Sequence, residues 1–301
     1  SARAVFDLGS KAGLGIHALS GCFEKESYEA LRSSYADYVV SCGSSLAGVN
    51  LSLKKELGAR SIVIMKPNIF DIKDFDLAVI PSHDMVKPAK NTVFTKGTVT
   101  VLDAAALRGY AARLNEKVKI TKQKVIGVLI GGDSRDYVLE KELAAEVMDG
   151  VLRAAGEIDA EVLVTTSRRT QRAVEFALKE RYGKSGRIKL LLIANDGNFE
   201  GAIEGILGLS DILVVSGESV AMLTEAVSSD RPVIAFMPRK IRPRSASKLE
   251  RSVGNLEKEA LIRVSTPAEI AEDIIHYIGH EPAAVSGGDI AAVRAALGKI
   301  I

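Results

Sequence analysis

Short apolar runs alternate with longer segments of helical period along most of this 301-residue chain. Runs of about four to eight residues rich in Val and Ile are typical of buried strands, whereas apolar residues spaced three or four apart are typical of one face of a helix. Strands that alternate with helices form parallel sheets connected by crossover helices. The pattern therefore predicts an α/β protein.

The first part of the chain contains three predicted strands. They are Tyr38–Ser41, Ser61–Met65 and Leu77–Ile80, and a helix is predicted between the first two at Leu46–Leu57. Gly58 follows this helix directly, and glycine often ends a helix because it adopts left-handed backbone angles without strain. These elements predict the start of a parallel sheet.

A helix from about Asp103 to Lys117 separates the two parts of the chain. Before it, between residues 82 and 100, the periodicity fades, while within it Ala and Leu residues fall near one face. Because clear strand patterns resume only after this segment, we interpret it as a helix that links two domains.

The second part contains six predicted strands with helices between them. They are Val125–Gly132, Glu161–Thr165, Leu190–Ala194, Ile212–Ser216, Val233–Phe236 and Ile262–Val264. This arrangement predicts an open parallel sheet of the nucleotide-binding type, in which ligands bind beyond the carboxyl ends of the strands.

Composition limits the classes of function. Hydrophobic residues make up 47% of the chain and charged residues 26%, as in soluble globular proteins. The net charge of +2 provides no field for a polyanion, so nucleic acid is not an expected partner. The longest apolar runs are strand-sized, far short of the roughly 20 residues of a membrane helix. No transmembrane segment is expected.

The two cysteines and the start of the chain bear on its compartment. Cys22 and Cys42 lack metal-type spacing and are too few for a disulfide scaffold, which indicates reduced thiols and a cytoplasmic protein. The chain begins with Ser1 rather than Met and lacks a signal-peptide pattern. A processed or truncated start is therefore expected, and an upstream segment is left open.

The first candidate site is the turn after the strand that begins at Val125. Gly131 and Gly132 let a backbone approach a ligand closely, Ser134 supplies a hydroxyl and Arg135 can clamp a phosphate. The turn matches neither the GxGxxG dinucleotide motif nor a P-loop, so those two classes are not favoured. An ordinary strand-to-helix turn is the alternative.

The second candidate site follows the strand Glu161–Thr165. Ser167, Arg168 and Arg169 are predicted at the start of a helix, where hydroxyl groups are favoured as caps. Cations at this position oppose the helix dipole. Two arginines there are more easily explained by an anionic ligand than by capping alone.

The third candidate site lies between the strand Ile212–Ser216 and the helix after it. Ser216, Gly217 and Ser219 combine small residues and hydroxyl groups at a predicted helix N-terminus, which favours phosphate binding. Glu218 and Glu225 could accept hydrogen bonds from a sugar or ribose hydroxyl. Together the three turns predict a ligand crevice at the carboxyl edge of the second sheet.

The densest basic run of the chain extends from Arg239 to Arg251. Three interpretations stay open for it: a solvated loop, a flexible clamp over a diphosphate, or peripheral contact with an anionic membrane surface.

Four motifs lie in order along the chain: FDLAVIPSHD (75–84), IGVLIGGDSRDY (126–137), LVTTSRRT (163–170) and VVSGESVAMLTEAVSSDRPV (214–233). With Asn91 and the turn that begins at Thr95, they resemble the mitochondrial fission ELM-type family, which is named for a plant elongated-mitochondria protein and is widespread in bacteria. The resemblance extends from Tyr38 to about Val264. Members of this family resemble glycosyltransferases of the GT-B fold.

The resemblance implies two Rossmann-like domains facing a cleft. Residues 1–100 would form the acceptor-side domain, 101–121 the linking helix, and 122–280 the nucleotide-sugar-binding domain. Residues 281–301 would form a C-terminal helix that packs back on the first domain.

The resemblance also implies a nucleotide-sugar as donor substrate, with no cofactor and no metal. The SGESVAMLTEA stretch would hold the diphosphate and sugar, with Glu218 and Glu225 as candidate hydroxyl acceptors. Around the nucleotide and phosphates would lie Ser134, Arg135, Ser167 and Arg168.

Candidate catalytic bases lie in the first domain. His17 follows a Gly-rich segment, and His83 with Asp84 follows the strand Leu77–Ile80; a His beside a carboxylate can deprotonate an acceptor hydroxyl. A loop histidine and a structural turn are the respective alternatives. Residues 1–36 lack the Asn-Gln pair that the family generally carries near its start.

Three functions are consistent with these patterns. The first is a metal-independent GT-B-type glycosyltransferase acting on an unknown acceptor. The second is a non-enzymatic scaffold of the ELM-type family, and the third is a nucleotide-sugar epimerase, which requires an acid and a base in the cleft. The intact turns of the second domain favour the glycosyltransferase among these three functions.

Overall fold

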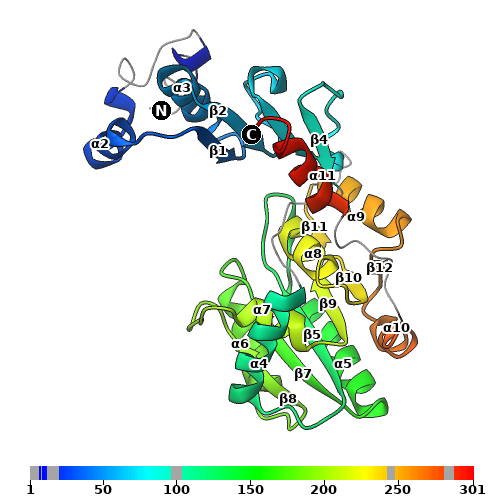
Figure 1. Cartoon of the computed structure of the whole chain (residues 1–301). Helices are drawn as coiled ribbons and strands as arrows, with labels where there is room; N and C mark the ends of the chain where they lie inside the picture. Colours follow the sequence, from blue (N-terminus) through cyan, green and yellow to red (C-terminus); the bar gives the residue numbers. More distant parts are fainter. Residues whose placement is uncertain (1–6, 8, 12–19, 96–103, 243–247, 281–287) are drawn as a thin grey trace. The chain divides into compact units, whose positions relative to one another are not determined.

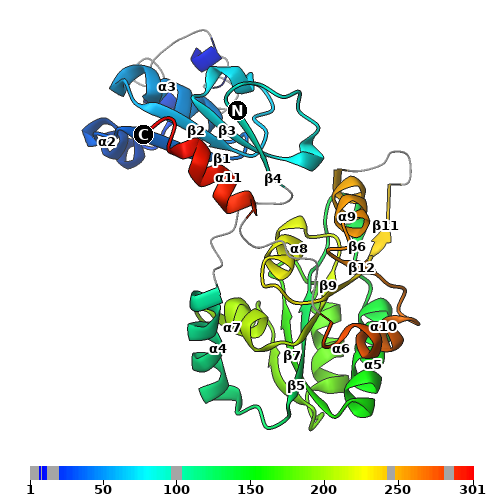
Figure 2. The same cartoon turned by 45° about the vertical axis from the view of Figure 1, so that its right-hand side comes forward.

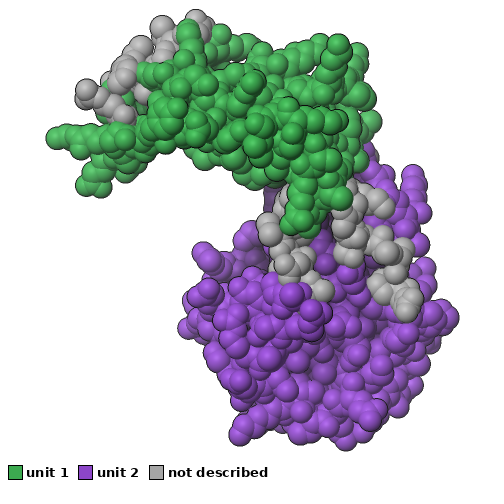
Figure 3. All heavy atoms as spheres, viewed as in Figure 1, with its two compact units in different colours: residues 1–99, 287–301 green, residues 100–286 purple. Residues whose placement is uncertain are grey.

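The computed structural model describes residues 7, 9–11, 20–95, 104–242, 248–280 and 288–301. The chain divides into two compact units, which Figure 3 colours separately. Unit 1 comprises Ser1–Val99 and Gly287–Ile301, and unit 2 comprises Thr100–Ser286. Each unit contains a parallel sheet with helices, so the α/β prediction is confirmed (Figure 1).

Unit 1 contains a four-stranded parallel sheet in the order β1-β2-β3-β4. The three strands predicted for this part are confirmed, whereas β4 was not predicted. Helix α3, Ala47–Leu57, ends at Gly58, whose φ of 67° is left-handed as predicted. Helix α2 is Lys25–Ser33, and the strands are β1 Tyr38–Cys42, β2 Arg60–Ile64, β3 Leu77–Pro81 and β4 Thr92–Thr95.

Helices cover both faces of the unit 1 sheet. Ala47 of α3 belongs to a buried cluster with Val63 and Ile80 on one face. Helix α11, Gly288–Leu297, packs Val293 and other apolar residues against β2 and β3 on the opposite face (Figure 2). The end of the chain is therefore part of the core of unit 1.

Unit 2 contains a six-stranded parallel sheet in the order β12-β10-β9-β5-β7-β8. The six predicted strands are confirmed, although β8 begins two residues earlier than predicted. A short antiparallel pair, β6 with β11, was not predicted. The bounds are β5 Lys124–Ile130, β6 Tyr137–Val138, β7 Ala160–Thr166, β8 Ile188–Leu192, β9 Ile212–Ser216, β10 Val233–Phe236, β11 Arg239–Lys240 and β12 Arg263–Val264.

Alternate residues of the central strands face two separate cores. In β5, Ile126 and Val128 pack in the core covered by α5, α6 and α10, while Val125 and Leu129 pack in the core under α4, α7, α8 and α9. Strands buried on both faces are uniformly apolar, which explains the unbroken runs in the sequence. The helices are α4 Ala104–Val118, α5 Lys141–Glu157, α6 Arg172–Tyr182, α7 Ala202–Leu209, α8 Val220–Val227, α9 Lys248–Lys258 and α10 Ile270–Tyr277.

The helix that the sequence analysis interpreted as a link is α4, which belongs to unit 2 and packs against α7. Gly208 of α7 allows this contact, because a Cβ atom there would lie 2.6 Å from the carbonyl oxygen of Leu107 and 3.0 Å from the Cβ of Ala111. Within the described residues, no helix is both long enough and apolar enough to cross a membrane.

Replacing Gly208 with Ala is expected to destabilise unit 2 by about 1–3 kcal/mol, because overpacking against a backbone atom forces the two helices apart. Gly109 of α4 is the matched control, since a Cβ atom there meets nothing within 4 Å. Gly109→Ala is expected to raise the free energy of unfolding by up to about 1 kcal/mol through helix propensity. Urea unfolding of both variants tests this, and a Gly208→Ala variant as stable as the wild type would refute the packing argument.

Candidate functional site

The three candidate turns of unit 2 are neighbours at one edge of its sheet. Strands β9, β5 and β7 are adjacent and parallel, so the turns that follow them meet at the carboxyl edge. This edge is where open parallel sheets bind ligands. The turn after β5 lies between the other two.

Two hydrogen bonds join the turn after β5 to the turn after β9. The backbone N–H of Gly131 donates to the hydroxyl oxygen of Ser216 over 2.6 Å. The backbone N–H of Gly132 donates to Oε1 of Glu218 over 2.8 Å, and the side chain of Glu218 has no exposed surface. A buried carboxylate therefore satisfies a buried amide.

A second set of hydrogen bonds joins the turn after β5 to the turn after β7. The hydroxyl of Thr170 donates to the carbonyl oxygen of Gly131. Asp133 donates its backbone N–H to the carbonyl oxygen of Arg169 over 3.3 Å, and Nη1 of Arg169 donates to the carbonyl oxygen of Asp133 over 3.2 Å. The three turns thus form one hydrogen-bonded unit.

The two glycines of the central turn are required by this contact. A Cβ atom on Gly131 would lie 1.7 Å from Oε1 of Glu218, and one on Gly132 would lie 2.2 Å from the carbonyl carbon of Arg169. The sequence analysis attributed the glycines to the close approach of a ligand. The described structure gives them a different requirement, the packing of the turns against one another.

Glu218 occupies the interior of the turn cluster. Burial raises its pKa more than the N–H of Gly132 and the charge of Arg169, whose Nη2 is 3.9 Å from Oε1, lower it. Its second oxygen, Oε2, forms no hydrogen bond with the described residues. The predicted contact of Glu218 with a sugar hydroxyl stays a prediction, and its burial does not favour it.

The turn after β7 is stabilised by its own side chains. The N–H of Ser167 donates to the hydroxyl oxygen of Thr170 over 2.9 Å, and the N–H of Arg169 donates to Oγ of Ser167 over 3.1 Å. Helix α6 begins only at Arg172. The prediction that Arg168 and Arg169 lie at the start of this helix is wrong, so the helix-dipole argument for an anion does not apply to them.

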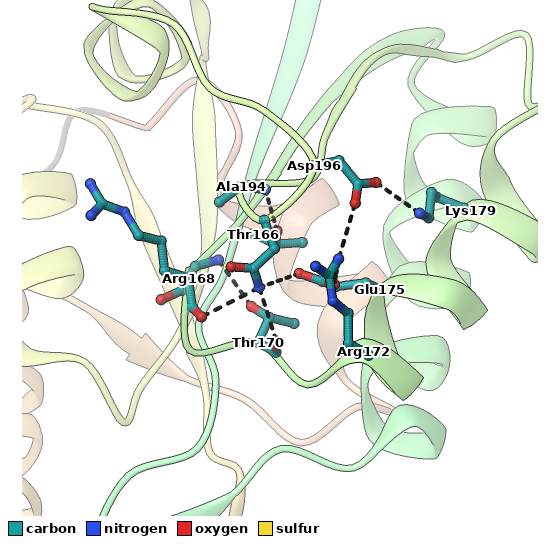
Figure 4. A network of polar contacts seen from close by, with 10 residues as sticks. Thr166, Arg168, Thr170, Arg172, Glu175, Lys179, Ala194 and Asp196 are labelled. Carbon is teal, nitrogen blue, oxygen red and sulfur yellow. Dashed lines mark hydrogen bonds and ion pairs between the residues drawn. The ribbon is translucent and has the colours of Figure 1, made fainter.

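Arg135 and Arg168 are exposed and have no ion pair or side-chain hydrogen bond with the described residues. Figure 4 shows the side chain of Arg168 extending away from the polar network that holds its backbone. By contrast, Arg172 lies 3.0 Å from Asp196 and Arg187 lies 3.3 Å from Asp159. Two guanidinium groups at the carboxyl edge therefore have no counter-charge within the part of the chain that the structure describes.

The turn after β9 leads into α8. Ser219 is buried and holds the N-cap position without a side-chain capping bond. The first backbone N–H groups of any helix lack partners within the helix, so this end of α8 presents donors. In the turn after β5, Ser134 is half-buried, and its hydroxyl forms no hydrogen bond with the described residues.

Glu225 lies on α8, beyond the turn. Burial raises its pKa, and the carboxylate of Glu204 on α7 raises it further. Its electrostatic neighbour is therefore a residue of α7, and no hydrogen bond joins it to the three turns. The predicted contact of Glu225 with a sugar or ribose hydroxyl stays a prediction.

In unit 1, Asp84 joins two turns of the sheet. It is buried, and its Oδ2 accepts a hydrogen bond from the backbone N–H of Lys66 over 3.3 Å. This contact matches the structural-turn alternative for the motif. The side chain of His83 and the whole of His17 lie outside the described residues, so their catalytic roles stay predictions.

Part of the basic run is neutralised by acidic partners. Nε of Arg239 lies 2.7 Å from Oε1 of Glu140, and Nζ of Lys240 lies 2.6 Å from Oε1 of Glu250. Residues 243–247 lie outside the described part of the structure. Membrane contact through this run stays a prediction that these two ion pairs do not favour.

The sequence analysis missed Asn195. Its Nδ2 lies 2.6 Å from Oε1 of Glu175, 3.3 Å from the carbonyl oxygen of Arg168 and 3.4 Å from that of Thr170. The available signal was its position directly after a predicted strand, at the same carboxyl edge as the three turns.

Two pockets of unit 2 are formed by described residues away from the three turns. Unit 2 has a pocket of about 410 Å³ beside Tyr110 and Phe199, and one of about 460 Å³ beside Glu146 and Arg153. Neither is lined by residues of the three turns. Among the described residues, no group of three or more His, Cys, Asp or Glu side chains could hold a metal ion.

Glu218 is expected to give opposite results with two substitutions. Glu218→Gln retains an oxygen acceptor for Gly132 and removes the ionisable group. A raised folded pKa means that the wild type loses stability as the pH rises above the ordinary value of 4.5, whereas the variant does not. The variant is therefore expected to match the wild type at pH 4 and to be more stable than the wild type at pH 8.

Glu218→Ala leaves the N–H of Gly132 without a partner and creates a cavity, so a loss of about 2–4 kcal/mol is expected at both pH values. Urea unfolding at pH 4 and pH 8 measures both variants. A Gln variant that loses as much stability as the Ala variant at pH 8 would contradict the role of Glu218 as the buried acceptor for the N–H of Gly132.

Two solved structures with the same fold are UDP-GlcNAc 2-epimerases. The enzyme from Methanocaldococcus jannaschii is 12% identical with a TM-score of 0.57, over 94% of this chain and 81% of the other. The enzyme from Neisseria meningitidis, solved with UDP-GlcNAc bound, is 10% identical with a TM-score of 0.57, over 95% and 82%. At these identities the likeness shows the fold, and the prediction of a GT-B-like fold is confirmed.

Similarity in sequence identifies the family. Mitochondrial fission protein ELM1 of Arabidopsis thaliana is 21% identical over 218 residues, which are 65% of this chain and 50% of that protein. The chain thus matches only half the length of this relative. Residues 14–280 match the family described as Mitochondrial fission ELM1, a range that includes all three turns. The resemblance found in the sequence is therefore confirmed, and the chain belongs to the mitochondrial fission ELM1 family.

Proposed function

We propose that unit 2 binds a nucleotide-sugar at the carboxyl edge of β5, β7 and β9, and that the chain is a metal-independent glycosyltransferase. The diphosphate lies against Arg168 and the first turn of α8 in this proposal. The sugar is transferred to a hydroxyl group of an acceptor that is not yet identified.

The unpaired guanidinium of Arg168 carries this proposal. Six other arginines of unit 2, listed here, have acidic partners within 4 Å: Arg169, Arg172, Arg181, Arg187, Arg239 and Arg263. Arg168 lies in the turn after β7, on one side of the turn cluster, and has no such partner among the described residues. A guanidinium offers two parallel N–H donors that match the oxygens of a phosphate group.

Neighbouring groups supply the rest of a diphosphate site. Arg135 adds a second unpaired guanidinium, Ser134 adds a hydroxyl, and α8 adds the backbone N–H donors of its first turn. During glycosyl transfer, negative charge develops on the departing nucleoside diphosphate. Fixed cations and N–H groups stabilise that charge, which is the chemistry that this proposal assigns to unit 2.

An epimerase is the second candidate, because the fold neighbours named above are UDP-GlcNAc 2-epimerases. An epimerase requires an acid and a base in contact with the sugar. In the three turns, Glu218 is buried, and Asp133 accepts hydrogen bonds from the N–H of Leu139 and from Nε2 of Gln171. Both carboxylates are thus engaged inside the protein, which favours transfer over epimerisation.

A non-enzymatic scaffold is the remaining alternative from the sequence. Its support is the name of the plant relative, a mitochondrial fission protein, of which this chain covers half the length. A scaffold without a ligand would leave the unpaired Arg168 and Arg135 unexplained. We therefore retain nucleotide-sugar binding as the proposal.

The proposal predicts that UDP-, GDP- or CDP-sugars raise the unfolding temperature of the purified chain. A ligand at about 100 times its dissociation constant should stabilise the folded state by roughly 2.7 kcal/mol. Arg168→Ala is expected to abolish most of this shift, because it removes a charged phosphate contact. Arg187→Ala is the matched control, since Arg187 precedes β8 at the opposite edge and pairs with Asp159.

Three outcomes separate the functions. A shift in unfolding temperature that is lost in Arg168→Ala and kept in Arg187→Ala supports the proposed site. Release of free nucleoside diphosphate that requires an acceptor and is unchanged by EDTA supports metal-independent transfer. Formation of an epimeric sugar nucleotide without any acceptor would favour the epimerase. No shift with any nucleotide-sugar would contradict the proposal and leave the scaffold.

A further inference from the structure

Asn195 connects the turn that carries Arg168 to helix α6. It follows β8, the strand next to β7, and its side chain reaches the backbone of the neighbouring turn. Figure 4 shows this network around Arg168, Thr170 and Glu175. The functions weighed above assign no role to Asn195.

The side-chain amide of Asn195 has two hydrogens and three acceptors. One hydrogen bonds Oε1 of Glu175 over 2.6 Å, which is a short contact to a charged group. The other hydrogen is shared between the carbonyl oxygens of Arg168 and Thr170, at 3.3 and 3.4 Å. The strong bond to Glu175 sets the orientation of the amide, and the shared hydrogen holds the turn.

Glu175 is itself fixed. It is 1% exposed, and its Oε2 accepts a hydrogen bond from Nη1 of Arg172 over 3.1 Å. Arg172 also contacts Asp196, which in turn pairs with Lys179 over 2.8 Å. The amide of Asn195 is therefore anchored to α6 by a buried carboxylate with a second charged partner.

The network holds the backbone from which the side chain of Arg168 extends. The carbonyl of Arg168 is held by Asn195, and the next N–H, that of Arg169, is held by Oγ of Ser167. The side chain has no partner of its own among the described residues. The contacts of the turn therefore fix where the side chain starts and leave the guanidinium free to meet a ligand.

We infer that Asn195 is a positioning residue for anion recognition. Through Glu175 and the carbonyl of Arg168, it holds the turn from which the guanidinium of Arg168 extends to the diphosphate of a nucleotide-sugar. This inference rests on the proposed function. A turn that is already ordered in the free protein strengthens binding because less backbone freedom is lost when the ligand binds.

A double-mutant cycle tests the inference. Dissociation constants for UDP, GDP and CDP are measured by calorimetry for the wild type, Asn195→Ala, Arg168→Ala and the double variant. Asn195→Ala is expected to weaken binding about tenfold in the wild-type background, because the loosened turn has to be ordered when the ligand binds. In the Arg168→Ala background it should change the dissociation constant less than about twofold, because its effect passes through Arg168.

Asn198→Ala is the matched control, because Asn198 lies in the same segment and its Oδ1 accepts only the N–H of Phe199. It should bind like the wild type. If Asn195→Ala does not fold, Asn195→Ser, which keeps a polar group but cannot span the three acceptors, replaces it in the cycle. Failure of both variants to fold would overturn the inference by making Asn195 a folding residue.

The remaining outcomes separate this inference from the proposed function. Equal weakening by Asn195→Ala in both backgrounds would show that it does not act through Arg168 and would overturn the inference alone. No binding of any nucleoside diphosphate by the wild-type chain would overturn the proposed function, and the inference with it.

Discussion

The hydrogen bond between the N–H of Gly132 and the buried carboxylate of Glu218 holds the candidate site together. A carboxylate without exposed surface is stable only with donors and charges close by, and here a backbone amide and Arg169 supply them. Because the bond spans two turns, it fixes the turn after β9 against the turn after β5. The glycines follow from it, since Oε1 of Glu218 occupies the space of a Cβ atom on Gly131.

This constraint separates two kinds of residues in the same motifs. Gly131 and Glu218, which the sequence analysis assigned to ligand contact, are used for contacts between the turns. Arg135 and Arg168, which those contacts do not use, remain exposed at the edge. The hydrogen-bonded turns thus form a fixed backbone that carries these two arginines, so the backbone of the site loses little freedom when a ligand binds.

Much of the fold could be predicted from the sequence, because its strands are buried on both faces. Strand β9 has the predicted bounds, since an apolar run ends there in Ser216. Strand β8 was placed two residues late because Lys189 interrupts the apolar run. In the structure Lys189 belongs to the strand, and its charge is paired with the buried Glu161 over 3.1 Å. The two-residue pair β6 with β11 depends on contacts about 100 residues apart, such as Arg239 with Glu140, which no local pattern reveals.

The site could be predicted only in part. The positions of three turns after parallel strands follow from topology, but the roles of their residues depend on contacts between turns. The start of α6 was misplaced because Thr170 folds back to the carbonyl of Gly131 instead of extending the helix. Asn195 was missed because its partners Arg168 and Glu175 are 27 and 20 residues away in sequence.

The most direct test of the central claim is a crystal structure of the chain with the nucleoside diphosphate that stabilises it most. The account predicts phosphate oxygens within hydrogen-bond distance of the Arg168 guanidinium and of the backbone N–H groups in the first turn of α8. It also predicts that Glu218 keeps its bond to Gly132 in the complex. A diphosphate bound elsewhere, with Arg168 still free in solvent, would contradict the account.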